Sequence, residues 1–198
     1  ALGALLHRPL PATAVRSRSR ISLICVGAAL TLVLVGALAR KSHETLIHHE
    51  RGLMYLENRH NDRAIEEFNR AIASDPAFAP AHNVLGVAYL RKASFEQAIN
   101  AFKKCLELNP EVSVREMAFY NMGLAYLELS RNDEAIGAFN QSLQLNSQDP
   151  DTHHFLGEAY LVKERYDEAI TALQQSHKLK PDQVGPRIGL GEAYEAKG

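Results

Sequence analysis

Histidines are the residues of this chain whose number and spacing could support chemistry, and the chemistry they suggest is metal binding. The chain has nine histidines in 198 residues, including the adjacent pairs His48-His49 and His153-His154. Adjacent residues on an α-helix point about 100° apart, so neither pair can hold one ion between its two rings. We therefore expect no metal site, and we expect His48, His82 and His153 to be packed between helices.

Other reactive groups do not form a recognisable catalytic set. The sequence has no phosphate-binding loop and no GxSxG, HExxH or CxxC motif. Acidic pairs such as Glu66-Glu67 are expected on exposed helix faces, and Cys25 and Cys105 lie too far apart in the pattern to pair. We expect no catalytic residue, no cofactor and no small-molecule substrate.

A glycine followed three residues later by a tyrosine occurs five times and indicates which elements carry these residues. The glycines are separated by 34, 37, 34 and 34 residues, and the pairs are Gly52 and Tyr55, Gly86 and Tyr89, Gly123 and Tyr126, Gly157 and Tyr160, and Gly191 and Tyr194. A repeat of this length is typical of stacked helical pairs. Apolar residues recur at helical spacing on both sides of the first glycine, which predicts one helix that ends near Glu57 and a second from about Asn61 to Ser74.

Small residues in each second helix match the glycine in each first helix. A glycine inside a helix costs about 1 kcal/mol relative to alanine, so five of them predict a close approach of two helices. We expect the approaching residue to be an alanine, namely Ala64, Ala98, Ala135 or Ala169. Large residues of the second helix are expected to fill the remaining space, namely Phe68, Phe102, Phe139 and Leu173.

This pattern resembles the tetratricopeptide repeat, W-x2-L-G-x2-Y…A-x3-F…P. The resemblance implies an all-α fold, a right-handed superhelical solenoid of antiparallel helix pairs. The expected repeats are residues 45–78, 79–112, 116–149, 150–183 and a partial fifth at 184–198. The first aromatic of the motif is replaced in most repeats, where His48, His82, Phe119, His153 and Arg187 stand.

Two irregularities interrupt the repeats. Three extra residues follow Pro110, and we expect them to form a small bump at one rim and to open the stack slightly. The fifth repeat has only its first helix, so we expect Gly191 and Tyr194 to face no second helix. The chain therefore looks truncated after residue 198.

The resemblance also implies a binding surface. In this family the first helix of each repeat lines a concave groove, chiefly through its fifth and ninth positions. Here these positions hold His49, Leu53, Asn83, Val87, Tyr120, Leu124, His154 and Glu158. They include no lysine or arginine, so a clamp for acidic C-terminal tails is not expected, and an amphipathic helix or an extended apolar peptide is the expected ligand. Replacing Tyr120 and Leu124 by alanine is expected to abolish capture of that partner.

The N-terminal region predicts contact with a membrane. Residues 1–20 are basic and expected to be disordered, and residues 21–39 are nineteen residues without a charge, long enough to span a bilayer as a helix. Arginines before this segment favour an uncleaved anchor with the repeats on the periplasmic or extracytoplasmic side. A signal peptide cleaved after Ala39 and an organellar presequence are the alternatives.

Charge and the N-terminal segment limit the classes of partner. Residues 1–43 carry six bases and no acid, so the rest of the chain carries 16 bases and 23 acids, and an acidic solenoid is not expected to bind nucleic acid. The export-like segment and the sequence EMAFYNMGLAYLELSRNDEAI resemble type IV pilus biogenesis and stability proteins, which implies a scaffold in secretin assembly. The alternatives are the substrate-selecting arm of a larger enzyme and an organellar import receptor.

Overall fold

The structure is a computed structural model that describes residue 35 and residues 37–198. It divides into two units, residues 1–43 and 44–198. In the first unit, residue 35 and residues 37–43 are helical. The basic segment 1–20 and most of the apolar segment 21–39 lie outside the described residues. Among the residues that are described, no helix combines the length and the apolar composition that crossing a bilayer requires.

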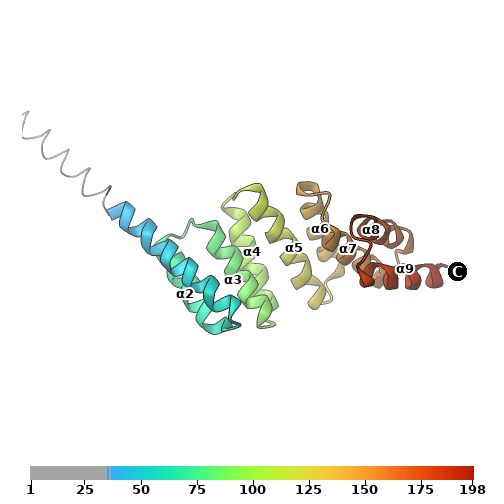
Figure 1. Cartoon of the computed structure of the whole chain (residues 1–198), viewed down its shortest axis with the longest axis horizontal. Coiled ribbons are helices and arrows are strands. Elements are labelled where there is room, and N and C mark those ends of the chain that lie inside the picture. The colour runs from blue at the N-terminus through green and yellow to red at the C-terminus, as the bar shows by residue number, and fades with distance from the viewer. Residues whose placement is uncertain (1–34, 36) are drawn as a thin grey trace, which may run out of the picture. The chain divides into compact units, whose positions relative to one another are not determined.

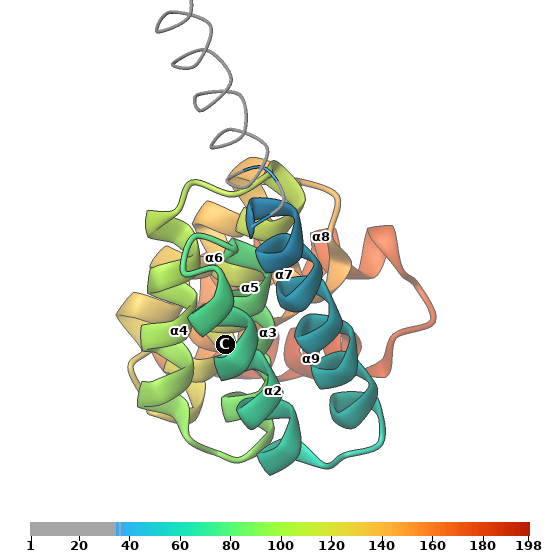
Figure 2. The same ribbon diagram turned by 90° about the vertical axis from the view of Figure 1, so that its left-hand side faces the viewer.

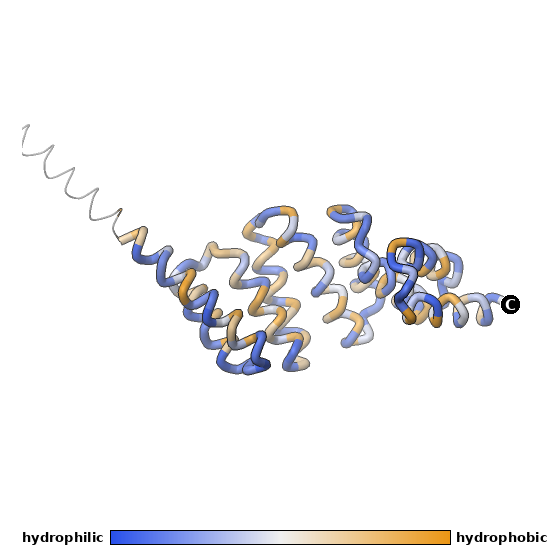
Figure 3. The backbone as a smooth tube through the Cα atoms, viewed as in Figure 1, coloured by the Kyte–Doolittle hydropathy of each residue, from blue (hydrophilic) through white to orange (hydrophobic). Residues whose placement is uncertain are grey.

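The second unit is a series of antiparallel helices that follow one another along the stack (Figure 1). Residues 44–57 are helical. They are followed by α2 (Asn61–Ser74), α3 (Ala79–Arg91), α4 (Phe95–Glu107), α5 (Val112–Glu128), α6 (Asn132–Leu145), α7 (Pro150–Val162), α8 (Tyr166–Leu179) and α9 (Val184–Lys197). Apolar and polar residues are mixed along all of these helices (Figure 3). Helices α2 and α4 are strongly amphipathic, whereas α3, α5 and α7 carry apolar residues on several faces and must be covered by neighbours on more than one side.

The contacts between helices define an inner and an outer row. The first helices of successive repeats touch each other, α3 with α5, α5 with α7 and α7 with α9. The second helices α2, α4, α6 and α8 contact only first helices within this unit. Figure 2 views the stack from the end at which α2 lies in front. Because one row is closely packed and the other is spread apart, the first helices form the inner, concave side.

The repeated glycines make room chiefly for a large side chain of the second helix, which corrects the expected contact with an alanine. A Cβ atom on Gly86 would lie 2.4 Å from Cε1 of Phe102, and one on Gly123 would lie 2.5 Å from Cε1 of Phe139. Gly157 faces Leu173 in the same way, at 2.5 Å from its Cγ. The prediction of close approach was correct, but the approaching atoms belong to the large side chain one turn after each alanine.

The three extra residues after Pro110 lengthen a helix. Helix α5 has 17 residues, whereas α3 and α7 have 13 each. The additional residues form one more turn at the start of α5, where Val112 is exposed and Val114 packs against the core. A turn of helix satisfies its own backbone hydrogen bonds, so this insertion needs no irregular loop.

Glu67 is buried, although the sequence placed the Glu66-Glu67 pair on an exposed face. Its Oε2 lies 2.7 Å from Nδ1 of His48, and its other oxygen accepts from Arg70. Burial alone would raise the pKa of this carboxyl, but His48 and Arg70 hold it below its ordinary value. The contact between His48 and Glu67 joins helix 44–57 to α2. His48 therefore forms a polar contact and is not only packed between helices.

The end of the stack confirms the expectation for Gly191. A Cβ atom on this glycine would meet no heavy atom within 4 Å. Helix α9 instead contacts α8 through Gly189, whose Cβ would lie 3.0 Å from Cδ1 of Leu173. The expectation for Tyr194 is wrong in part: its side chain is 52% exposed, but its hydroxyl accepts a hydrogen bond at 2.9 Å from Gln174 of α8, the second helix of the preceding repeat.

A left-handed residue follows the first helix of each complete repeat, and none of these residues is glycine. The backbone φ angles at this position are 60° at Arg59, 55° at Ala93, 58° at Ser130 and 57° at Glu164. At the same position of the fifth repeat stands Gly198, with φ 83°. For a residue with a Cβ atom, the left-handed conformation is less stable than the right-handed one by roughly 1–2 kcal/mol. Each complete repeat therefore contains a strained turn.

Replacing Ala93 by glycine is therefore expected to stabilise the protein. The relief of strain exceeds the entropy that glycine adds to the unfolded chain, and we expect a gain of about 0.5–1 kcal/mol in the free energy of unfolding. Urea denaturation measures the change. The exposed helical residue Ala73 is the control, because Ala73→Gly should lower stability by about 0.5–1 kcal/mol. Equal signs for the two variants would contradict the strain argument.

Candidate functional site

The eight residues expected at the groove all lie on first helices, and so on the inner row. They come from helix 44–57, α3, α5 and α7, two from each and four residues apart. Residues at this separation share one helix face, so each helix presents one pair. Contacts of α3 with α5 and of α5 with α7 bring the last three pairs alongside one another.

The aliphatic residues among these eight groove residues are half-buried. Leu53, Val87 and Leu124 each pack against the hydrophobic core and keep part of their surface open. They therefore both support the fold and supply apolar surface to the inner face. More exposed apolar surface is found on the same helices at Met117, which is 44% exposed and three residues before Tyr120.

The polar members of the row contain unsatisfied atoms. Asn83 is 5% exposed, and its Oδ1 has no hydrogen-bond partner among the described residues. Nδ1 of His49 and Nδ1 of His154 are likewise buried without a partner in this part of the chain. An unpaired buried polar atom costs about 1–3 kcal/mol, so these atoms are sites where a bound peptide could improve the hydrogen bonding.

Tyr120 is more deeply involved in packing than the sequence indicated. Its ring centroid lies 6.2 Å from that of Phe139 and 6.1 Å from that of Phe155. Burial raises the pKa of Tyr120 to about 12, and the carboxylates of Asp151 and Asp149 contribute to the increase. Replacing Tyr120 and Leu124 by alanine should therefore weaken the fold as well as the groove, so that pair of substitutions is a poor test of binding.

His154 and Glu158, the two groove residues of α7, contact each other. Nε2 of His154 lies 3.3 Å from Oε1 of Glu158, whose side chain is 46% exposed. Helix α9 covers the histidine, because a Cβ atom on Gly185 would lie 2.7 Å from its ring. This end of the groove presents a carboxylate to solvent, and the middle of the groove presents apolar groups.

The fold changes the ionisation of His49. Its ring lies 5.1 Å from that of Phe78 and 6.0 Å from that of Phe68. Burial lowers the pKa of His49, and the opposing effect of Glu50 is smaller. The folded protein therefore holds this imidazole neutral at pH values where the unfolded chain already binds a proton.

Acidification is expected to destabilise the protein through His49. Since the folded-state pKa lies below the unfolded value, the unfolded state binds more protons and stability falls as pH drops below about 6.5. Urea midpoints at pH 7 and pH 5.5 measure this loss, and the loss should be smaller in His49→Gln. An NMR titration that places the pKa of His49 above 6.5 would contradict the prediction.

The histidines at the first aromatic position of the second and fourth repeats are only partly enclosed. Nε2 of His82 donates to the carbonyl of Pro76 at 3.1 Å, and Nε2 of His153 donates to the carbonyl of Ser147 at 3.1 Å. Both remain half-buried, which corrects the expectation that they are simply packed between helices. Within the described residues there is no group of three or more His, Cys, Asp or Glu side chains suited to a metal ion.

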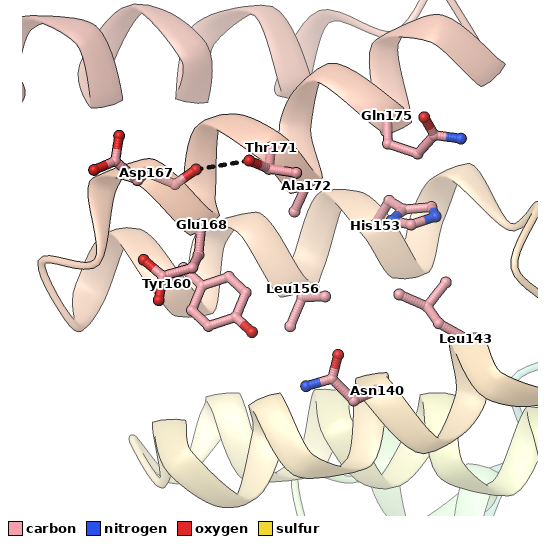
Figure 4. A pocket seen from close by; sticks show the side chains of 10 residues that line it. All are labelled: Asn140, Leu143, His153, Leu156, Tyr160, Asp167, Glu168, Thr171, Ala172 and Gln175. Atoms are coloured by element: carbon pink, nitrogen blue, oxygen red, sulfur yellow. Dashed lines mark hydrogen bonds between the residues drawn. The ribbon is translucent and has the colours of Figure 1, made fainter.

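A cavity on the outer side of the stack was not anticipated from the sequence. It has a volume of about 500 Å³ and lies between α6 and α8, with α7 as its floor (Figure 4). Leu143, Leu156 and Ala172 supply apolar surface, and Asn140 and His153 supply polar atoms. None of the eight groove residues lines it. The only sequence signal was the histidine that stands where the repeat motif has an aromatic residue.

The fold and its inner surface define a helical-repeat protein of the kind that presents a surface to other polypeptides. A family model described as "Tetratricopeptide repeat" matches residues 49–113 and 120–184. The chain therefore belongs to the tetratricopeptide repeat family.

Similar proteins agree with this assignment. Superkiller complex protein 3 of Homo sapiens is 36% identical over 61 residues, which are 31% of this chain and 4% of that protein. The crystal structure of MamA protein is similar with a TM-score of 0.71 and 26% identity, and covers 78% of this chain and 83% of its own. YrrB, titled a TPR protein with an unusual peptide-binding site, has the same fold with a TM-score of 0.67 and 20% identity, over 76% of each chain.

Proposed function

We propose that this protein is a scaffold that holds a partner protein along the inner row of first helices. The observation that carries the proposal is the combination of half-buried Leu53, Val87 and Leu124 with the unpaired polar atom of Asn83 on one continuous face. Apolar surface with a few hydrogen-bonding groups suits an amphipathic helix or an extended apolar peptide. A protein-binding role is also the general one of this family and fold.

A photoreactive amino acid at Met117 tests the proposal without disturbing the core, because this side chain is 44% exposed on the inner face. We expect it to form a covalent adduct with the partner in cells. The matched control is the same amino acid at Gly137, an exposed position of α6 where a Cβ atom meets nothing within 4 Å. Adducts from position 137 and none from position 117 would place the partner on the outer face and refute the proposal.

We further propose that residues 21–39 tether the scaffold to a membrane, with the repeats on the extracytoplasmic side. The support is the nineteen-residue uncharged segment with arginines before it. Cell fractionation followed by an alkaline wash tests this proposal, and we expect the chain to stay with the membrane pellet. Recovery in the soluble cytosolic fraction would contradict it.

Assembly of a secretin for type IV pili is the specific role proposed for this scaffold. It is supported by the resemblance of residues 116–136, within the third repeat, to pilus biogenesis and stability proteins. In a host that assembles such pili, deletion of the chain is expected to reduce secretin multimers on a gel without reducing the secretin monomer. Unchanged multimers would exclude this role and leave the general scaffold proposal standing.

A further inference from the structure

The outer side of the stack contains two cavities that are built from matching residues. The cavity between α6 and α8 has a counterpart of about 330 Å³ between α2 and α4, floored by α3. Every residue that lines the second cavity corresponds to one that lines the first after a shift of 71 residues, which is two repeats. Both volumes fall in the range of about 300–1,000 Å³ that is typical of ligand sites.

The two cavities share an apolar floor and an unpaired amide. The apolar lining of the first cavity consists of Leu143, Leu156 and Ala172, and that of the second consists of Ile72, Leu85 and Ala101. An asparagine occupies the same place in each, Asn140 and Asn69, and neither side chain has a hydrogen-bond partner in the part of the chain that the structure describes. An amide of this kind can both donate and accept a hydrogen bond.

A histidine lines one end of each cavity, at the repeat position where the motif has an aromatic residue. His82 and His153 are bonded through Nε2 to loop carbonyls, which holds each ring to one end of its cavity. Figure 4 shows His153 at that end, beside Leu143 and Gln175, with Tyr160 at the other. The corresponding residue of the third repeat is Phe119, and its ring packs against the core. The stack therefore accommodates an aromatic side chain at this position of the repeat.

We propose that each outer cavity binds one aromatic side chain of a partner protein, a tryptophan or a tyrosine. The ring would lie on the apolar floor, and its N–H or O–H would donate to the carbonyl oxygen of Asn140 or Asn69. Tryptophan and tyrosine combine an apolar ring with one polar atom, which matches this surface. The site is independent of the inner row, since the two surfaces share no residue.

The absence of tryptophan from the sequence makes the test direct. The probe is N-acetyl-tryptophanamide, whose indole fluorescence has no background from the protein. In a titration of the full chain we expect a saturable blue shift with two sites. His153→Phe, which copies Phe119, should leave one site, and the double variant His82→Phe with His153→Phe should leave none. N-acetyl-leucinamide should compete roughly tenfold more weakly, because it lacks the ring.

Two further measurements protect the result against misfolded variants. Thermal unfolding reports whether the phenylalanine variants fold. In the unsubstituted chain, NMR shifts of the methyl groups of Leu143 and Leu156 should follow the titration, and those of Leu53 and Leu124 on the inner face should not. No saturable blue shift, undiminished binding by the folded double variant, or shifts confined to the inner face would each overturn the proposal. The first two outcomes do not bear on partner binding by the inner row, whereas shifts confined to the inner face would place the probe on that row instead.

Discussion

Replacing Gly123 by alanine is expected to lower the free energy of unfolding by up to about 2 kcal/mol, although alanine is the better helix former. The new Cβ would lie 2.5 Å from Cε1 of Phe139, whose ring is completely buried and cannot move away without displacing its neighbours. Overpacking of this kind costs roughly 1–3 kcal/mol or more, which exceeds the gain of about 1 kcal/mol in helix propensity. Urea denaturation followed by circular dichroism measures the change.

Gly191 provides a control of the same residue type at the same repeat position. No heavy atom would lie within 4 Å of its Cβ, so Gly191→Ala should stabilise the protein by up to about 1 kcal/mol through propensity alone. The two substitutions are chemically identical and should have opposite signs. If both substitutions stabilise the protein, the close contact between Gly123 and the ring of Phe139 is contradicted.

Replacing Phe139 by alanine is expected to have the largest effect, a loss of about 3–5 kcal/mol. The ring is fully buried and stacks on Phe155 of the next repeat, with centroids 6.3 Å apart and planes inclined by 17°. Its removal leaves a cavity at the junction of two repeats, where a stack that depends on nearest neighbours is most easily divided. Hydrogen exchange should therefore show lost protection in α5 to α8 before it does in α2 and α3.

Tyr194→Ala is the control for this substitution, since Tyr194 is an aromatic residue that is 52% exposed, and its loss should cost less than about 1 kcal/mol. A double-mutant cycle then tests the contact itself. With Phe139 replaced by alanine, Gly123→Ala should become neutral or stabilising, because the clashing ring is gone. Additive effects of the two substitutions would show that the glycine and the ring do not interact.

The eight groove residues show which structural features the register of the repeats can predict. Once the glycines fix the register, helical geometry places His49 and Leu53, or Tyr120 and Leu124, on one face of their helix. The register does not show how deeply each side chain is buried. Asn83 is enclosed and the side chain of Glu158 is about half exposed, although both belong to the eight groove residues, because burial depends on side chains contributed by helices from other repeats.

The histidines and the acidic pair show where sequence reasoning failed. The pattern indicated that His153 replaces an aromatic residue, but not that its ring would bond to the carbonyl of Ser147 and leave a cavity beside it. Glu67 was expected at the surface and is buried against His48. A hydrogen bond between residues 19 positions apart depends on how two helices cross, and one residue's chemical type does not encode that angle.

The series of helix pairs with a period near 34 residues is evident from the sequence, because the recurrence of glycine and large apolar residues is a one-dimensional property. The sequence also predicts which residues share a helix face, since that follows from 3.6 residues per turn. The folded structure was needed to show that the glycines accommodate large side chains of the second helices, that an insertion becomes a turn of α5, and that the outer face contains two equivalent cavities. These features depend on distances between helices, which are set by the packing of side chains from different repeats.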